Sequence, residues 1–408
     1  MLKIDPKKMH HLYGKDTEKK KLTYKDGDLI DYTLMMLICA VVVYLSYGAM
    51  SIIGGIGILL SLLMICTFPF RHGYKLSAPV ILKRPQELIY MVLYRISNFP
   101  PLVLVAIGFL LLENYLIYLT PEWPHHTELM HTIALWLFYG HFIIISLYRS
   151  VILVAHLKKK EQVHEILMQS AWKRFISKKQ YFDLDIFHAY FTGLLTHIIL
   201  IAPWYIVINN FKFSVLVLPL AIIINMVVYY QYLKVLTIAL YREHWLGHNS
   251  EFEFLYLHGS HHDAIPCGLI GVSGNGFLEG FVRHSVAYTT AYFNPIFAFL
   301  AYTMDIYADI VAHQYIPGVY PGSVTPPTHH GVHHFMQLLP LSSGTNSEDR
   351  LPDLGFIKSA DAPIKMPEAL INSIQLDEQL SNYKQDNPRF RWYVELIRKY
   401  QGDDGKLD

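Results

Sequence analysis

Residues 33–70 read TLMMLICAVVVYLSYGAMSIIGGIGILLSLLMICTFPF, a stretch that contains no charged side chain. At about 1.5 Å of rise per residue, one helix of this length would be nearly twice as long as the hydrocarbon core of a membrane, which is about 30 Å thick. Two antiparallel helices are therefore expected. Gly48, Gly54, Gly55 and Gly57 lie near the middle, where a tight turn favours residues without a Cβ.

Four more apolar stretches follow along the chain, each of a length that suits a single span. The composition agrees with a membrane protein, because 52% of the residues are hydrophobic, only 16% are charged and the mean hydropathy is positive. The further candidate spans are residues 99–119, 131–155, 188–209 and 213–240. The predicted fold class is all-α, a multi-span helical membrane protein with about six transmembrane helices.

Lysine and arginine in the loops between these spans predict the orientation of the chain. The N-terminal arm and the loops 71–98 and 156–187 are basic, and in a six-span topology all three lie on one side. Loop 120–130 has no Lys or Arg, and the short turn near Asn209 has only Lys212. Because short basic loops stay in the cytoplasm, everything after residue 240 is predicted to be cytoplasmic.

Charge and cysteine usage exclude several other classes. A formal net charge of +1, without a long basic block, gives no surface for nucleic acid. Cys39, Cys66 and Cys267 form neither a disulfide framework nor a CxxC site, so a bound metal would be held by His and carboxylates. No apolar segment begins before about residue 32, and no signal peptide is expected.

Histidines are concentrated after the last predicted span. Eleven of the 22 lie between His244 and His334, and they include HWLGH (244–248), HGSHH (258–262) and HGVHH (330–334). On a helix, positions i, i+3 and i+4 share a face, so each of these boxes can present two or three imidazoles to one point. Neutral imidazole is a good ligand for iron, zinc or copper. The three boxes together contain eight histidines, which is more ligands than one ordinary metal ion binds. The boxes predict a two-metal site.

The three boxes, and the short gap between His248 and His258, resemble the fatty acid hydroxylase and sterol desaturase superfamily of integral membrane non-haem di-iron enzymes. Acyl-CoA desaturases carry similar boxes with a longer gap between the first two. The resemblance covers roughly residues 190–335 and implies a helical membrane stem topped by a cytoplasmic histidine-rich cap. It also implies two irons that activate dioxygen to hydroxylate or desaturate a lipid. A fatty-acyl substrate is favoured and a sterol is second.

The resemblance assigns roles to individual residues. The implied metal ligands are His244, His248, His258, His261, His262, His330, His333 and His334, with His313 as the best further candidate. Glu243, Asp263 and Asp309 are candidates for orienting imidazoles through the second ring nitrogen. No haem-binding His-Pro-Gly-Gly sequence occurs, so electrons are expected from a separate b-type cytochrome, or from a ferredoxin with its reductase.

The predicted organisation has four parts. They are a cytoplasmic N-terminal arm (1–31), four transmembrane helices with basic cytoplasmic loops (32–187), a catalytic domain with two transmembrane helices and the histidine-box cap (188–340), and a soluble cytoplasmic tail (341–408). The apolar stretch 285–304 must not cross the membrane, because one crossing would separate the second and third boxes. It is expected to be interfacial, re-entrant or packed under the cap, where protein can bury its backbone. The membrane is expected to be the endoplasmic reticulum in a eukaryote or the inner membrane in a bacterium.

Two other classes of protein fit part of the pattern. A histidine-rich metal transporter needs polar residues inside the spans, which offer only Glu113, His141, Arg149 and His197. A dizinc membrane hydrolase needs a carboxylate base, and Glu243 is available beside the first box. Metal analysis of the purified protein distinguishes the oxygenase from these two alternatives, because about two irons per chain favours the oxygenase. Zinc retained without oxygen uptake under reducing conditions would contradict it.

Overall fold

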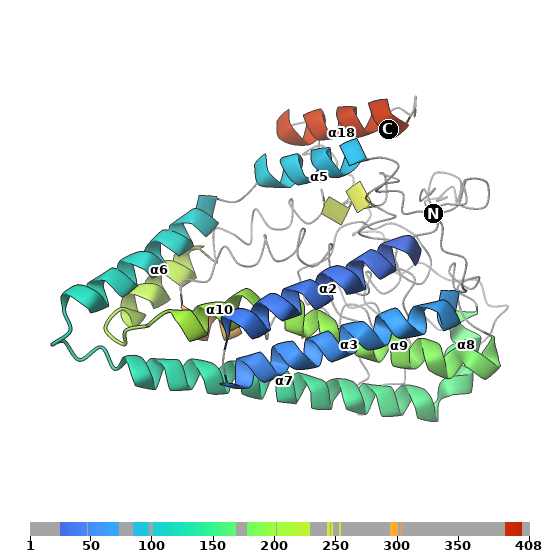
Figure 1. The fold of residues 1–408 in the computed structure, drawn as a ribbon, viewed down its shortest axis with the longest axis horizontal. Helices are drawn as coiled ribbons and strands as arrows, with labels where there is room; N and C mark the ends of the chain where they lie inside the picture. The colour runs from blue at the N-terminus through green and yellow to red at the C-terminus, as the bar shows by residue number, and fades with distance from the viewer. Residues whose placement is uncertain are drawn as a thin grey trace, which may run out of the picture.

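The structure, a computed structural model, describes part of the chain. The described residues are 25–46, 48–72, 85–97, 101–168, 178–200, 202–228, 294–300 and 388–401, together with 243, 244, 246, 247, 253 and 303. Within these residues every regular element is a helix and no strand occurs, which confirms the all-α class. Figure 1 shows α2, α3, α7 and α9 running alongside one another, with α5 and α18 lying together apart from them.

The first apolar stretch forms two antiparallel helices, as predicted. Helix α2 (Lys25–Leu45) and helix α3 (Gly48–His72) pack against each other, and Gly48 makes the turn at φ 60°, a conformation that favours glycine. The prediction that Gly54, Gly55 and Gly57 belong to this turn is wrong, because all three lie inside α3. A Cβ on Gly57 would meet Cys39 Sγ at 2.4 Å. This glycine therefore permits close contact between the two helices.

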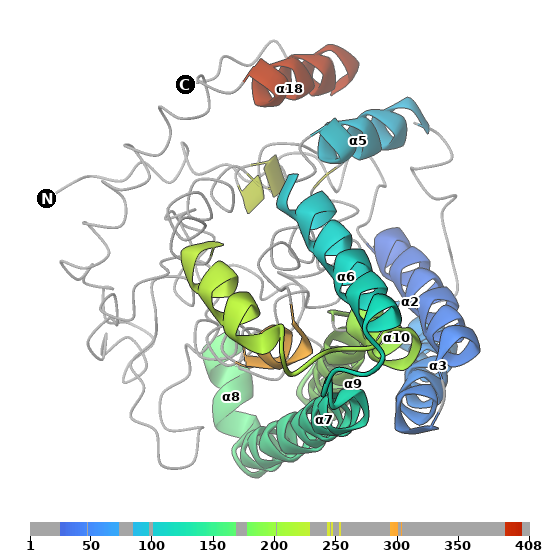
Figure 2. The same ribbon diagram turned by 90° about the vertical axis from the view of Figure 1, so that its left-hand side faces the viewer.

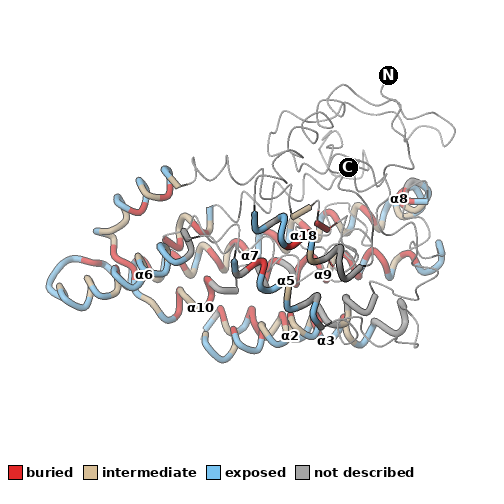
Figure 3. The backbone as a smooth tube through the Cα atoms, turned by 90° about the horizontal axis from the view of Figure 1, so that it is seen from above, coloured by how far each residue is buried: buried red, intermediate tan, exposed pale blue. Residues whose placement is uncertain are grey.

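Helix α7 (Thr127–Lys158) has an apolar outside and a partly polar inside. Its buried residues recur at intervals of three or four and include His141, Arg149 and His156, whereas Trp136, Ile144 and other large apolar side chains are exposed. Figure 3 shows buried and exposed positions alternating along its length. A helix in water has the opposite arrangement, with its apolar stripe inside and its charges outside. The exposed face of α7 therefore suits a lipid environment.

The predicted span 188–209 differs from what is observed. Helix α9 begins earlier, at Phe182, and ends at Leu200, and α10 then runs over Ala202–Asn210. Pro203 lies in the first turn of α10, where its missing N–H costs no hydrogen bond. Its ring, however, clashes with the preceding turn and prevents α9 from continuing into α10 as one regular helix. The apolar stretch is therefore two consecutive helices instead of one.

The mutually packed helices α2, α3, α7, α9 and α10 are called the stem here. By length and composition, two described segments are able to cross a membrane, Met50–Thr67 and Thr127–Lys158. Shorter apolar segments occur at Tyr32–Leu45, Leu104–Leu119 and Leu218–Val228, the second of them within α6 (Pro101–Leu119). The described part of the chain thus has the apolar helical character that the sequence predicts.

Two helices distant in sequence lie side by side away from the stem. Helix α5 (Pro85–Ser97) contacts α18 (Pro388–Gln401), as the views in Figures 1 and 2 agree. Both begin with proline, whose fixed φ suits the first helical position. Helix α5 buries Met91, Tyr94 and Arg95, which share one face. This face meets the segment that carries the first histidine box. Other described helical segments are α8 (Lys160–Leu167), the short 3-10 helix η3 (Lys179–Tyr181) that leads into α9, Leu218–Val228 and residues 295–300.

Candidate functional site

The first histidine box is the part of the predicted metal centre that the structure describes. Residues Glu243 and His244 are helical, as are Leu246 and Gly247, and Leu246 is buried. The other predicted ligands and supporting carboxylates lie outside the described residues: His248, His258, His261, His262, His313, His330, His333, His334, Asp263 and Asp309. Among the residues that are described, no three His, Cys, Asp or Glu side chains gather as a metal site would require.

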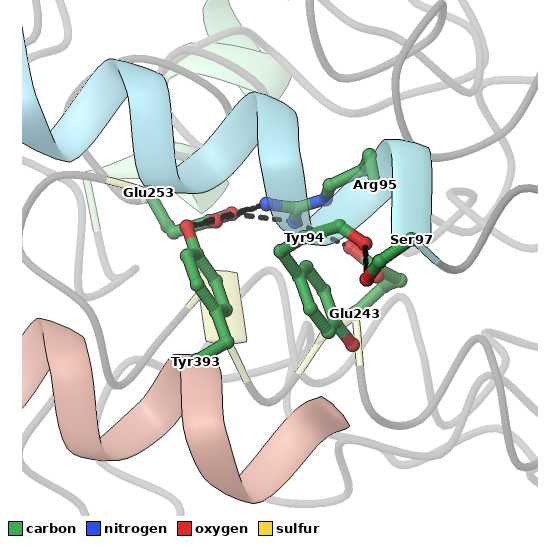
Figure 4. A network of polar contacts seen from close by, with 6 residues as sticks. All are labelled: Tyr94, Arg95, Ser97, Glu243, Glu253 and Tyr393. Atoms are coloured by element: carbon green, nitrogen blue, oxygen red, sulfur yellow. Dashed lines mark hydrogen bonds and ion pairs between the residues drawn. The ribbon is translucent and has the colours of Figure 1, made fainter. Parts of the chain in front are cut away.

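A buried guanidinium holds the chain on both sides of this box. Arg95 Nη2 donates to Glu243 Oε2 at 2.6 Å and to Glu253 Oε2 at 2.9 Å, and Arg95 Nη1 donates to Glu253 Oε1 (Figure 4). Glu253 is fully buried and Arg95 nearly so. The two parallel contacts to Glu253 are the bidentate geometry in which arginine binds a carboxylate most strongly.

Aromatic rings from α5 and α18 flank this ion cluster. Tyr393 stacks on Tyr94 with ring centroids 4.4 Å apart and planes 4° from parallel. The Arg95 guanidinium carbon lies 5.0 Å and 5.5 Å from the two ring centroids, within cation–π range. The Tyr393 hydroxyl donates to Glu253 Oε1 at 2.5 Å, and Arg389 donates to the Ser97 carbonyl. We call Arg95, Glu243, Glu253 and Tyr393 the Arg95 network.

The protonation of the network follows from its charges. Burial by itself would lower the pKa of Arg95, but Glu243 and Glu253 outweigh it and hold that pKa well above the ordinary value. Burial, together with the neighbouring Glu253 carboxylate, raises the pKa of Tyr393 well above that of a free phenol. At neutral pH the network therefore contains a guanidinium cation and a protonated phenol that donates to Glu253.

The sequence suggested few of these contacts. Arg95 was notable only as a positive charge in a predicted cytoplasmic loop, and the residues it contacts lie 148 to 298 positions away. The one available signal is Glu253, a charged residue between Phe252 and Phe254 in an otherwise apolar run. The role predicted for Glu243, orienting an imidazole, stays a prediction. The structure shows that one of its oxygens is bound to Arg95.

The segment between the second and third boxes packs against the stem. Asn294 is buried and caps the short helix 295–300, since its Oδ1 accepts the Ile296 N–H at 2.9 Å and Pro295 fills the first helical position. Phe299 meets His141 of α7 edge to face at 5.7 Å, and Thr303 lies 3.2 Å from His141 Nδ1. The described part of 285–304 therefore packs against α7 of the stem, and the choice among the three alternatives stays a prediction.

Polar side chains inside the stem are bound to stem partners. Arg149 Nε donates to His197 Nε2 at 2.5 Å, and His156 Nδ1 lies 2.9 Å from the Ile152 carbonyl of its own helix. Tyr32 and His188 are within hydrogen-bond distance at 2.9 Å, as expected for a core histidine outside the boxes. These pairings connect α7 to α9 and α9 to α2. His141 Nε2 and His197 Nδ1 are buried and have no hydrogen-bond partner among the described residues.

No protein-family model, curated protein sequence or solved structure matches this chain. The resemblance to the hydroxylase and sterol desaturase superfamily therefore rests on the residues of the three boxes and on their spacing.

Proposed function

We propose that this protein is a membrane-embedded di-iron oxygenase that hydroxylates or desaturates a lipid. A fatty-acyl substrate is favoured, a sterol is second, and the electrons come from a separate carrier. The observation that carries the proposal is the order and spacing of the three boxes, above all the short gap between His248 and His258. The box residues would hold two irons, which supply the oxidising chemistry when bound. The donor set is imidazole, which suits iron.

The proposal includes six membrane spans with the boxes on the cytoplasmic side. The apolar exposed face of α7 and its buried polar residues support membrane embedding. The contact of Arg95 with Glu243 and Glu253 supports the topology, because it joins loop 71–98 to the segment after the last span. Positive charge predicts both of these to be cytoplasmic. Phe299 packs against Phe138 and His141 of α7, and the proposal treats this stretch as backbone buried in protein instead of a crossing helix.

The chain's own residues would bind and orient the substrate in this proposal. The stem presents exposed apolar side chains along its helices, which suit contact with a lipid chain. The Arg95 network is nearly closed to water on the α5 side of the first box.

The dizinc hydrolase is less well supported, because one carboxylate oxygen of its candidate base, Glu243, forms an ion pair with the Arg95 guanidinium.

Metal analysis of the purified protein, combined with lipid mass spectrometry, tests the proposal. We expect about two irons per chain, and a defined lipid that is one oxygen heavier in cells expressing the protein than in cells without it. Desaturation would appear instead as the loss of two hydrogens. Unchanged lipids despite a metallated protein would refute the proposal, as would tightly held zinc without oxygen uptake under reducing conditions.

A further inference from the structure

The C-terminal helix α18 lies in the tail predicted to be a soluble appendage, yet it belongs to the Arg95 network. We propose that Arg95 and Tyr393 are positioning residues for the metal centre, which hold the first histidine box in place through Glu243 and Glu253. This inference rests on the proposed function, because it assumes that His244 and His248 bind metal.

Two carboxylates flank the first histidine box in the sequence. Glu243 directly precedes His244, and Glu253 lies between His248 and His258. Both carboxylates are bound to the same guanidinium, so the chain between them is tied at both ends to one point on α5. A segment tied at both ends has fewer accessible conformations than a free loop. His244 directly follows one of these ties, and His248 lies between the two in the sequence, so the inference is that both ligands depend on them.

Helix α18 adds a cover and a hydrogen bond to this ion cluster. Tyr393 covers the ion cluster with a ring stacked on Tyr94, and its hydroxyl donates to an oxygen of Glu253 that Arg95 also binds. Arg389 fixes the start of α18 to the Ser97 carbonyl at the end of α5. Excluding water from an ion pair strengthens it, because the local dielectric constant is lower. Helix α18 therefore tightens the hold of Arg95 on Glu253.

A network of charges beside the first box has an advantage other than stability. A buried ion pair generally contributes no more stability than well-packed apolar residues of the same volume, because removing the charges from water is costly. Its advantage is directional: a bidentate contact fixes the position and orientation of a carboxylate. The loss of a residue hydrogen-bonded to a metal ligand typically costs about 10- to 100-fold in metal affinity or activity. The Arg95 network would act less directly, through the backbone of Glu243 and Glu253, so we expect effects near the lower end of that range. The Arg95 network lies beside the first box, where it could orient the predicted metal ligands.

Iron release from the full-length protein tests the inference. The protein is purified in detergent, loaded anaerobically with ferrous iron and mixed with a ferrous chelator. Tyr393→Phe keeps the stacked ring and removes only the hydroxyl, and we expect iron release to become about tenfold faster. Arg95→Lys keeps the charge without the bidentate geometry, and we expect iron release faster than from the wild type but slower than from Arg95→Gln. Arg95→Gln should release iron fastest.

Three controls separate positioning from general destabilisation. Ile186→Val removes one buried methylene group in the stem, so it lowers the unfolding temperature without touching the network. Arg391→Gln removes a charge from the exposed side of α18, and Tyr181→Phe removes an exposed tyrosine hydroxyl. All three should release iron at the wild-type rate.

The outcomes distinguish this inference from the function on which it rests. Wild-type protein that takes up no iron would overturn both. Iron-loaded wild type, with release from Tyr393→Phe no faster than from Ile186→Val at a similar unfolding temperature, would overturn the positioning role alone. Faster release in the Tyr393 and Arg95 variants, with wild-type release in the three controls, supports it.

Discussion

The stem and the Arg95 network both contain a buried arginine, but they satisfy it differently. Arg149 in the stem donates to the imidazole of His197, whereas Arg95 binds the carboxylates of Glu243 and Glu253. In the stem, close contact depends on small residues such as Gly57, as is usual where lipid supplies little hydrophobic drive for helices to associate. The stem is therefore held together by close packing of helix surfaces, and the Arg95 network is held together by oriented contacts between charges.

The largest expected effect tests whether the chemistry belongs to the histidine-rich part of the chain. His261→Ala or His333→Ala should abolish lipid oxidation, because each removes a predicted iron ligand, while membrane insertion survives. Product formation is measured by mass spectrometry, and insertion by extraction from membranes. His126→Asn is a matched control, since asparagine tolerates the positive φ of 49° that His126 adopts. Near-normal turnover in either alanine variant would disprove the ligand assignment.

The next effect tests whether charges hold the α5–α18 contact. Arg95→Gln removes the cation between two acidic partners, and breaking a buried ion pair on one side typically costs about 3–5 kcal/mol. We expect α18 to detach, which increases amide hydrogen exchange in residues 388–401 and 85–97. Arg391→Gln on the exposed side of α18 serves as the control. Unchanged exchange in Arg95→Gln would mean that the ion cluster is not what fixes α18.

A smaller effect tests the role of surface fit in the stem. Gly57→Ala places a Cβ at 2.4 Å from Cys39 Sγ, and such overpacking typically costs about 1–3 kcal/mol. Gly55→Ala in the same helix is the matched control, because its Cβ would meet nothing within 4 Å. Titration with a denaturing detergent should show that Gly57→Ala unfolds earlier and that Gly55→Ala does not. Equal behaviour of the two variants would contradict the observed α2–α3 packing.

The smallest effect tests whether Asn294 caps the short helix that packs against the stem. Asn294→Ala removes the cap of helix 295–300, and the loss of such a cap typically costs about 1 kcal/mol. Asn294→Ser retains a capping oxygen and is the control. Local hydrogen exchange in residues 295–300 should rise in the alanine variant only. A rise of the same size in both variants would show that the Asn294 side chain does not act as a cap.

Local patterns in the sequence predict much of the helical structure. The absence of charge over 33–70 predicts two helices, and Gly48 forms the turn between them. The stretches 99–119 and 131–155 become α6 and α7 with modest changes at their ends. The break between α9 and α10 was missed because hydropathy does not register the steric effect of Pro203.

The sequence by itself determined the all-helical class, the apolar helices and the three histidine boxes, because helix periodicity and metal-ligand spacing depend on residues close together in the chain. Only the tertiary structure decided that Arg95 binds both sides of the first box and that Tyr393 covers the contact. Those partners lie up to 298 positions apart, and no local pattern specifies which distant charge a buried carboxylate will meet. Packing between elements makes that choice.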